Sequence, residues 1–442
     1  MNRSKVTKLL LVEGFLSEAT LALFDATSIV AMFLSTLGAS AWQIGLVAAV
    51  SLVGGRVPQI FVATRFHGRL RGLLVKFASF QWLATVFMAL SPGVAHFIGP
   101  GPALACFMLG WSCFSFGEGA SFVPWSEAVA STVGRRCGRF LGAYGLVESL
   151  GTMFAGMIVY IFARTGAMGN SPGYLGVFGT GSIVLMVTVP LLRRVEDYED
   201  SFRLSARPKL GLPPRPAVPF AIERGREGGA GHGNPGIARP RIPGRANAFR
   251  VFVRKMAMPG GRFRTFVGAQ FLSMGIYLIS PFIFLYGCNK LALTARASSL
   301  VVWAEMAGIS LGSVLAGRLA SRSGSGAVVK LSCVASAAVP ILAVLSGILP
   351  SMKLGLFAVM GSMLCLGVFY ASSWVGCTGY VVESTRETER PMIVAMLNLL
   401  ALPFMCLSPL GGLAIKQTGY VPVFGAALVS CLASAVLAFQ MD

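Results

Sequence analysis

The sequence predicts an all-α polytopic membrane protein, and three features indicate this fold class: an apolar composition, a series of long apolar segments, and an internal repeat. Of the 442 residues, 55% are hydrophobic and only 12% are charged. A soluble protein cannot hide that much apolar surface from water. Because hydrocarbon offers no water to backbone groups, each apolar segment of about 20 residues must satisfy its own hydrogen bonds as a helix.

About twelve such segments follow one another along the chain. We place them at residues 10–35, 42–64, 73–97, 101–126, 139–163, 173–192, 265–287, 298–319, 327–349, 352–378, 391–415 and 420–440. Glu13, Glu18 and Asp25 interrupt the first apolar run, whereas the apolar region of a signal peptide is uninterrupted. We therefore expect an uncleaved first helix.

Positive charge is concentrated on one side of the predicted spans. That side carries Arg3, Lys5, Lys8, Arg65, Arg69, Arg71, Arg135, Arg136, Arg139, Arg318 and Arg322. Cationic loops resist translocation, so we expect this side and both termini to be cytoplasmic, in a protein of the cell inner membrane. The net charge of +20 then fits contact with anionic lipid headgroups, and we expect no nucleic-acid partner.

The chain divides into three parts around its longest polar segment. Residues 193–264 are rich in Pro, Gly and Arg, a composition that cannot bury a core and predicts a disordered cytoplasmic linker. Residues 1–192 and 265–442 are then two six-helix bundles. The end of the linker, near Phe252, reads equally well as a short helix on the membrane surface or as an ordinary linker end.

Short segments of the first half recur in the second half, roughly 250 residues later. Gly173-Tyr174-Leu-Gly-Val-Phe-Gly at the start of the sixth span corresponds to Gly419-Tyr420-Val-Pro-Val-Phe-Gly at the start of the twelfth. Ser121-Phe122-Val123 corresponds in the same way to Ser373-Trp374-Val375. Six helices repeated in parallel about an axis along the membrane normal form a known transporter architecture.

With these repeats, the chain resembles the major facilitator superfamily over almost its whole length. The stretch 408–424, Ser-Pro-Leu-Gly-Gly-Leu-Ala-Ile-Lys-Gln-Thr-Gly-Tyr-Val-Pro-Val-Phe, is similar to the family's passage between helices eleven and twelve, and the loop 63–71 is similar to its loop between helices two and three. That loop lacks the usual aspartate, and the motifs of drug antiporters in helices four and five are absent. The resemblance implies two halves related by a pseudo-twofold axis and secondary transport by alternating access.

Ionisable side chains inside a span are costly, so each one indicates a function or a fixed polar contact. The candidates are Asp25, Glu18, Arg56, Glu118, Glu148 and Glu305. We expect a glutamate to bind Arg56, because an unpaired buried cation would be unfavourable. Asp25 or Glu18 is the expected proton acceptor, since apolar surroundings favour a neutral carboxyl group. A purely structural polar cluster remains the alternative.

The spans of the second half that would line a central cavity carry neutral polar and aromatic side chains instead. The candidates for substrate contact are Gln270, Tyr277, Tyr370, Trp374 and Asn398. Such a lining suits an organic solute, and the acid-rich first half favours a cationic or neutral one. Packing between helices explains the same residues equally well.

Charged side chains at equivalent places in the two halves suggest a cytoplasmic gate, because loops of this kind form salt bridges in the family. The candidates are Arg65, Arg69, Arg135, Arg139, Glu383 and Arg386. Glu13, close to the same boundary, is expected to contact loop arginines.

These features together predict a secondary active transporter of a small solute, coupled to protons or another ion, that works as a monomer. The nine cysteines are scattered and the three histidines form no cluster with metal-ligand spacing, so we expect no metal site, no cofactor and no lipid-modifying enzyme. A transporter-like sensor or assembly partner without turnover is the alternative. Import and export fit equally well.

Overall fold

The structure is a computed structural model that describes residues 3–65, 72–133, 137–164, 171–206, 252–256, 261–291, 293, 295–385 and 390–441. Within these residues the regular elements are helices, which confirms the predicted all-α class. They are α1 (Arg3–Leu23), α2 (Ile29–Thr36), α3 (Ala41–Gly54), α4 (Val57–Arg65), α5 (Leu73–Phe97), α6 (Pro100–Val133), α7 (Cys137–Arg164), α8 (Ser171–Ala206), α10 (Arg262–Ser273), η4 (Met274–Leu278), α11 (Ser280–Leu291), α12 (Ala295–Ser323), α13 (Ser325–Ser346), α14 (Met352–Ser384), α15 (Arg390–Met405), α16 (Leu407–Thr418) and α17 (Tyr420–Phe439).

Ten helical stretches of the described residues are long and apolar enough to cross a membrane, judged by length and composition. The other two expected spans correspond to α1 with α2 and to α6. Helix α6 has 34 residues and, at 1.5 Å per residue, a length of about 50 Å. The total of twelve spans stays a prediction.

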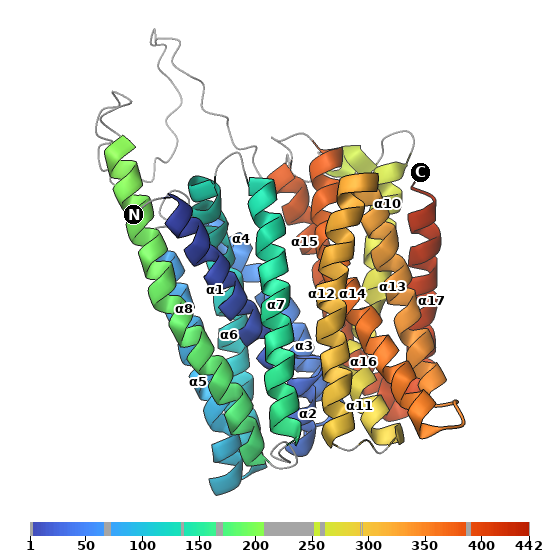
Figure 1. Cartoon of the computed structure of the whole chain (residues 1–442). Helices are drawn as coiled ribbons and strands as arrows, with labels where there is room; N and C mark the ends of the chain where they lie inside the picture. Colours follow the sequence, from blue (N-terminus) through green and yellow to red (C-terminus); the bar gives the residue numbers. More distant parts are fainter. Residues whose placement is uncertain are drawn as a thin grey trace, which may run out of the picture.

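The helices pack mainly within two groups. Helices α1 to α8 form the first group, and η4 with helices α10 to α17 forms the second, while α3 against α16 and α7 against α12 join the two groups. Both chain termini lie at the same end of the molecule (Figure 1). We call it the terminal end, and the opposite end, with the connection at residues 37–40, the distal end.

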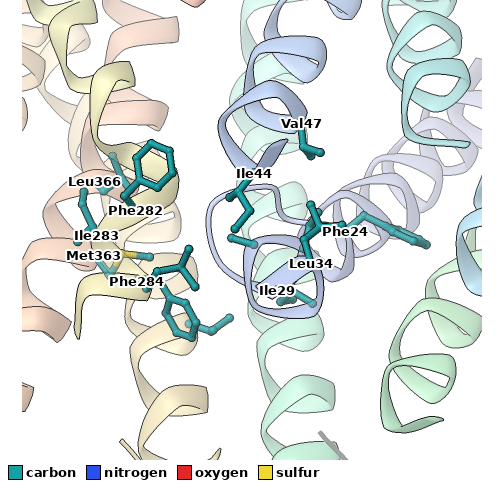
Figure 2. Close-up of a cluster of buried hydrophobic side chains, with 14 of the residues drawn as sticks. Phe24, Ile29, Leu34, Ile44, Val47, Phe282, Ile283, Phe284, Met363 and Leu366 are labelled. Atoms are coloured by element: carbon teal, nitrogen blue, oxygen red, sulfur yellow. The ribbon is translucent and has the colours of Figure 1, made fainter. Parts of the chain in front are cut away.

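Three apolar clusters reveal how the two groups of helices are joined. A shared core contains buried residues of both groups; Figure 2 shows Ile29 and Ile44 from the first group and Phe282, Ile283 and Met363 from the second. Two separate clusters lie nearer the terminal end. The first-half cluster includes residues such as Val6 and Val129, and the second-half cluster includes residues such as Phe266 and Ile393. The two groups therefore share one apolar core toward the distal end and have separate cores toward the terminal end.

Glycines allow the close approach that joins the groups. A Cβ atom at Gly45 of α3 would collide with the backbone of Ser408, and one at Gly412 of α16 would collide with the backbone of Ala41. Small residues at crossing points let two helix backbones come into contact inside a membrane. This part of the α3–α16 contact thus depends on the missing side chains.

Several spans expected to be continuous helices are interrupted. The first is broken at residues 24–28, the second at 55–56, the seventh passes through the 3₁₀ turn η4, and the eleventh is broken at Cys406. At the first break the Asp25 side chain accepts the backbone N–H groups of Thr27 and Ser28, which gives the freed backbone donors partners within the protein.

Parts of the expected linker, residues 193–264, are helical in the structure. Helix α8 continues past residue 192 to Ala206, because Val195 is buried in the first-half cluster and the Glu196 carboxylate accepts the backbone N–H of Val75, 3.4 Å away, near the start of α5. Residues 252–256 are helical, and Phe252 is buried in the second-half cluster rather than facing lipid. The three-part division of the chain otherwise stays a prediction.

Candidate transport site

A layer of polar side chains separates the shared core from the two terminal clusters. In the first half it contains Glu18 of α1, Arg56 between α3 and α4, Glu118 of α6 and Glu148 of α7. Along α1, for example, Glu18 lies between Leu10 of the first-half cluster and Leu23 of the shared core. The side chains of these four residues are partly exposed, although they lie between the buried clusters of the bundle.

The three glutamates of this layer have few partners. The Thr152 hydroxyl is 3.4 Å from Glu18 Oε1, and the Glu118 carboxylate accepts no hydrogen bond from the described part of the chain. Glu18 interacts electrostatically with both Glu118 and Glu148. Within the described residues none of the three forms an ion pair with lysine or arginine, so this part of the layer carries uncompensated acidic groups.

The second half contributes neutral side chains at the same level. Gln270 Nε2 donates to Ser373 Oγ at 3.0 Å, while Gln270 Oε1 is buried without a hydrogen-bond partner in the described residues. Asn398 lies between Leu397 of the second-half cluster and Ala401 of the shared core. We call the four first-half residues together with Gln270, Trp374 and Asn398 the polar layer.

Two contacts cross between the halves within the polar layer. Arg56 Nη1 donates to Asn398 Oδ1 at 2.5 Å, so the expected glutamate partner of Arg56 is replaced by an amide of the second half. Arg56 occupies the break after α3, from which it reaches α15. Phe122 and Trp374 meet edge to face, with ring centroids 6.1 Å apart, although 36% and 54% of these side chains are exposed. They are the corresponding residues of the internal repeat.

Asp25 lies deeper, in the break between α1 and α2 within the shared core. Its Oδ2 atom accepts four hydrogen bonds, from the backbone N–H groups of Thr27 (3.0 Å) and Ser28 (2.7 Å) and from their hydroxyl groups at 2.7 and 2.6 Å. Asp25 therefore fixes the start of α2, an arrangement typical of an aspartate at a helix N-terminus.

Glu305 of α12 meets this break from the other half. Thr27 Oγ1 lies 2.5 Å from Glu305 Oε1, and Glu305 is 1% exposed. Tyr370 of α14 interacts electrostatically with both Glu305 and Asp25, and Tyr277 of η4 is stacked on Tyr370 at 6.5 Å. We call Asp25, Thr27, Ser28 and Glu305 the carboxyl link, because it joins the two halves through acidic side chains.

Three solved structures with a similar arrangement of helices are those of transporters. The chain superimposes on the nucleoside transporter NupG with a TM-score of 0.63 and 15% identity, covering 100% of this chain and 98% of that one. A D-xylose-proton symporter gives a TM-score of 0.66 and 13% identity, covering 99% and 96% of the two chains. The xylose transporter XylE from E. coli, in a partially occluded inward-open conformation, gives 0.61 and 11%, covering 100% and 99%.

This chain has the major facilitator superfamily fold. No family model and no curated protein sequence matches the chain, so the fold is recognised through structure and not through closely similar sequences. The superposition extends over nearly the whole of each protein, which is what the resemblance noted in the sequence implies.

Most of the expected gate residues fall outside the described part of this fold. Arg69, Arg135 and Arg386 lie outside the described residues, and so do the side chains of Arg65 and Arg139. Glu383 is described: its carboxylate accepts the backbone N–H of Ser325 at 3.2 Å and the Ser325 hydroxyl at 2.7 Å. In this structure Glu383 thus stabilises the start of α13, where an acidic group is favourable.

Glu13 also differs from the expectation. Instead of loop arginines, it contacts Ser17 at 2.9 Å, the indole N–H of Trp125 at 3.2 Å and the Tyr144 hydroxyl at 3.4 Å. Glu13 is 5% exposed and holds α1 against α6 and α7. It belongs to the packing of the first half and not to the polar layer.

Thr27 and Phe122 were not among the residues predicted from the sequence as site residues. Thr27 follows Asp25 by two positions, a spacing typical of local hydrogen bonding to an aspartate, and Phe122 stands opposite Trp374 in the repeat. Both signals were present in the sequence. The described residues contain no group of three or more His, Cys, Asp and Glu side chains placed to hold a metal ion.

Proposed function

We propose that this protein is a secondary active transporter that moves a small polar solute together with a proton by alternating access. The observation that carries the proposal is the polar layer, which lies between one core shared by both halves and two cores that are separate. Two halves that are joined on one side of a polar site and separate on the other can expose that site to one side of the membrane at a time.

The charge of the polar layer indicates the class of solute. Three glutamates are present with a single cation, and Arg56 is engaged by Asn398. An anionic solute would therefore be repelled, whereas a neutral or cationic one would find hydrogen-bond acceptors. The half-exposed Trp374 offers a surface on which a ring can pack. NupG transports nucleosides and XylE transports xylose; such uncharged ring compounds with hydroxyl groups fit the polar layer, and this likeness supports the proposal.

The orientation follows from the charge distribution. We propose that the terminal end faces the cytoplasm of a cell with the protein in its inner membrane, that lipid surrounds the bundle, and that the protein acts as a monomer. The first-half cluster and the second-half cluster then lie on the cytoplasmic side. The loop residues Arg65, Arg69, Arg135, Arg139 and Arg386 remain candidates for a gate on that side.

A transport assay with labelled solutes tests the proposal. Purified protein in liposomes would be loaded with unlabelled D-xylose, uridine or an organic cation such as tetraethylammonium, and exchange against the labelled compound would be measured. We expect the wild type to exchange at least one solute and Glu118→Gln to exchange it much more slowly. Ser112→Ala is the control and should exchange the solute at the wild-type rate, because the Ser112 hydroxyl donates within α6 to Met108 O. Absence of exchange across the whole panel would favour a sensor or assembly role.

A further inference from the structure

The carboxyl link contains more short oxygen contacts than its hydroxyl groups can supply with hydrogen atoms. Three such contacts are present: Thr27 Oγ1 to Asp25 Oδ2 at 2.7 Å, Ser28 Oγ to Asp25 Oδ2 at 2.6 Å, and Thr27 Oγ1 to Glu305 Oε1 at 2.5 Å. Each hydroxyl group has one hydrogen atom, and an ionised carboxylate has none. Two hydrogens cannot bridge three contacts. A third must come from a protonated carboxyl group.

Asp25 is not the group that carries this hydrogen. Its Oδ2 atom accepts two backbone N–H groups in addition to the two hydroxyls, and backbone donors cannot reverse their direction. Four donors directed at one oxygen atom stabilise the negative charge of an ionised carboxylate. The hydrogen therefore belongs to Glu305.

The surroundings of Glu305 agree with this assignment. Its Oε2 atom is buried and has no hydrogen-bond partner in the described residues. Burying an ionised carboxylate with an unpartnered oxygen is far more costly than burying a neutral one. The charged or titratable groups near it are Asp25 and Tyr370, with Tyr277 beside Tyr370, and no cation among them would compensate a negative charge.

Among the described residues, the helices packed against the carboxyl link place no cation beside Glu305. Helix α7 packs on α12, and its acidic residue Glu148 interacts with Glu18 and Glu13 rather than with Glu305. Arg56 is engaged by Asn398 in the polar layer. Within the described residues the proton is thus the available means of neutralising Glu305.

We infer that Glu305 binds the transported proton, and that its O–H group, donated to Thr27, holds the two halves of the protein together at the carboxyl link. This inference rests on the proposed transport function and names the proton site within it. When the halves separate, water reaches Glu305, its O–H bond breaks, the electron pair stays on the carboxylate and the proton leaves as hydronium. The resulting carboxylate is repelled by Asp25 and cannot donate to Thr27, so the halves stay apart until a proton binds again.

Infrared spectroscopy of the purified full chain in lipid locates the proton directly. A protonated carboxyl group has a C=O stretching band that a carboxylate lacks. We expect Glu305→Gln to lose one such band, and Asp25→Asn to keep it. Thr27→Val should keep the band and shift it, since the hydrogen bond to Thr27 is lost. Loss of the band in Asp25→Asn, or its persistence in Glu305→Gln, would overturn the inference.

Amide hydrogen exchange measures how often the carboxyl link opens, and it requires no solute. Raising the pH should speed amide exchange in α2 and in α12 around residue 305, because loss of the proton opens the link. Glutamine at 305 still offers an N–H donor to Thr27, so exchange in Glu305→Gln should no longer depend on pH beyond the intrinsic chemical effect. Ser313→Ala is the matched control on α12, since the Ser313 hydroxyl donates to Ile309 O of its own helix, and it should behave as the wild type. The same pH dependence in Glu305→Gln as in the wild type would contradict the inference.

These experiments separate the two levels of the account. The band and the exchange pattern report the proton on Glu305 whether or not a solute is moved, whereas solute exchange in liposomes tests the proposed function. Observation of the Glu305 band without any transport would support the proton site and contradict the proposed transport function. Proton-coupled transport without that band would support the proposed transport function and show that the proton binds to a residue other than Glu305.

Discussion

The polar layer and the carboxyl link both hold acidic side chains inside the bundle, but they differ in hydrogen bonding. The Glu118 carboxylate of the polar layer accepts no hydrogen bond from the described residues, whereas Asp25 Oδ2 accepts four hydrogen bonds and Glu305, which is 1% exposed, contacts Thr27. Carboxylates with free acceptor positions can bind water or a solute, and a carboxylate engaged by four donors, such as Asp25, holds one arrangement of the backbone. The comparison separates where a solute binds from what holds the halves together.

The largest effect is expected at the crossing of α3 and α16, which joins the two groups of helices. A methyl group at Gly412→Ala would collide with the Ala41 backbone, and since backbone cannot yield as a side chain does, we expect about 3 kcal/mol of destabilisation. Thermal unfolding in detergent measures it. Gly425→Ala is the control, because nothing lies within 4 Å of a Cβ at that position. Equal melting temperatures of the two variants would show that the α3–α16 contact is looser than described.

Removal of one hydroxyl group from each region tests the comparison itself. Thr27→Val removes the hydroxyl group that lies in contact with both Asp25 and the buried Glu305, and we expect a loss of about 2 kcal/mol in the free energy of unfolding. Thr152→Val removes a 3.4 Å contact to the partly exposed Glu18 and should change it by less than about 0.5 kcal/mol. Chemical unfolding in mixed micelles measures both values. Similar losses would remove the distinction between the two regions.

The hydrogen bond between Arg56 and Asn398 should couple the halves within the polar layer. A double-mutant cycle with Arg56→Gln and Asn398→Ala is expected to give a coupling energy of about 1.5 kcal/mol, the low end for a hydrogen bond to a charged group, because water competes at this level. The corresponding cycle with Arg56→Gln and Ser112→Ala should give none. A coupling near zero in the first cycle would mean that Arg56 faces water in solution.

The smallest effect is expected at the aromatic contact. Trp374→Ala removes an edge-to-face pair with Phe122 worth about 1 kcal/mol, which is roughly a fivefold change in an equilibrium. We expect the terminal side of the polar layer to open more often, measured as faster reaction of an introduced cysteine at Glu118, a residue of the layer, with a maleimide. Trp374→Phe should restore much of the closure. Unchanged reactivity in Trp374→Ala would show that this pair does not control access.

Much of this arrangement follows from the sequence, because a charge in a membrane span is rare enough to indicate a site. Glu18, Glu118 and Glu148 could be placed at one level by counting residues along their helices. The partner of Arg56 could not be predicted in this way. It depends on the direction in which the break after α3 points the Arg56 side chain toward the second half. Thr27 was missed because a hydroxyl group costs little in a helix, and its role arises only where Glu305 approaches from a residue 278 positions away.

The end of α8 and the breaks in the spans likewise could not be predicted from hydropathy. Hydropathy ends the sixth span at residue 192, but packing of Val195 in the first-half cluster extends the helix to Ala206. Hydropathy likewise does not register the break at Asp25, because a side chain that satisfies backbone donors replaces the missing helical hydrogen bonds. Apolar composition predicts that a segment is in the membrane, while local hydrogen bonding decides where the helix stops.

The most direct test of the account is proton movement evoked by a solute. Wild-type protein, Glu305→Gln and Ser313→Ala would be placed in liposomes with an enclosed pH dye, and a solute that the wild type exchanges would be added on one side. The account predicts a pH change with the wild type and Ser313→Ala, and solute exchange without a pH change with Glu305→Gln. A pH change of wild-type size with Glu305→Gln, or transport by the wild type without any pH change, would contradict it.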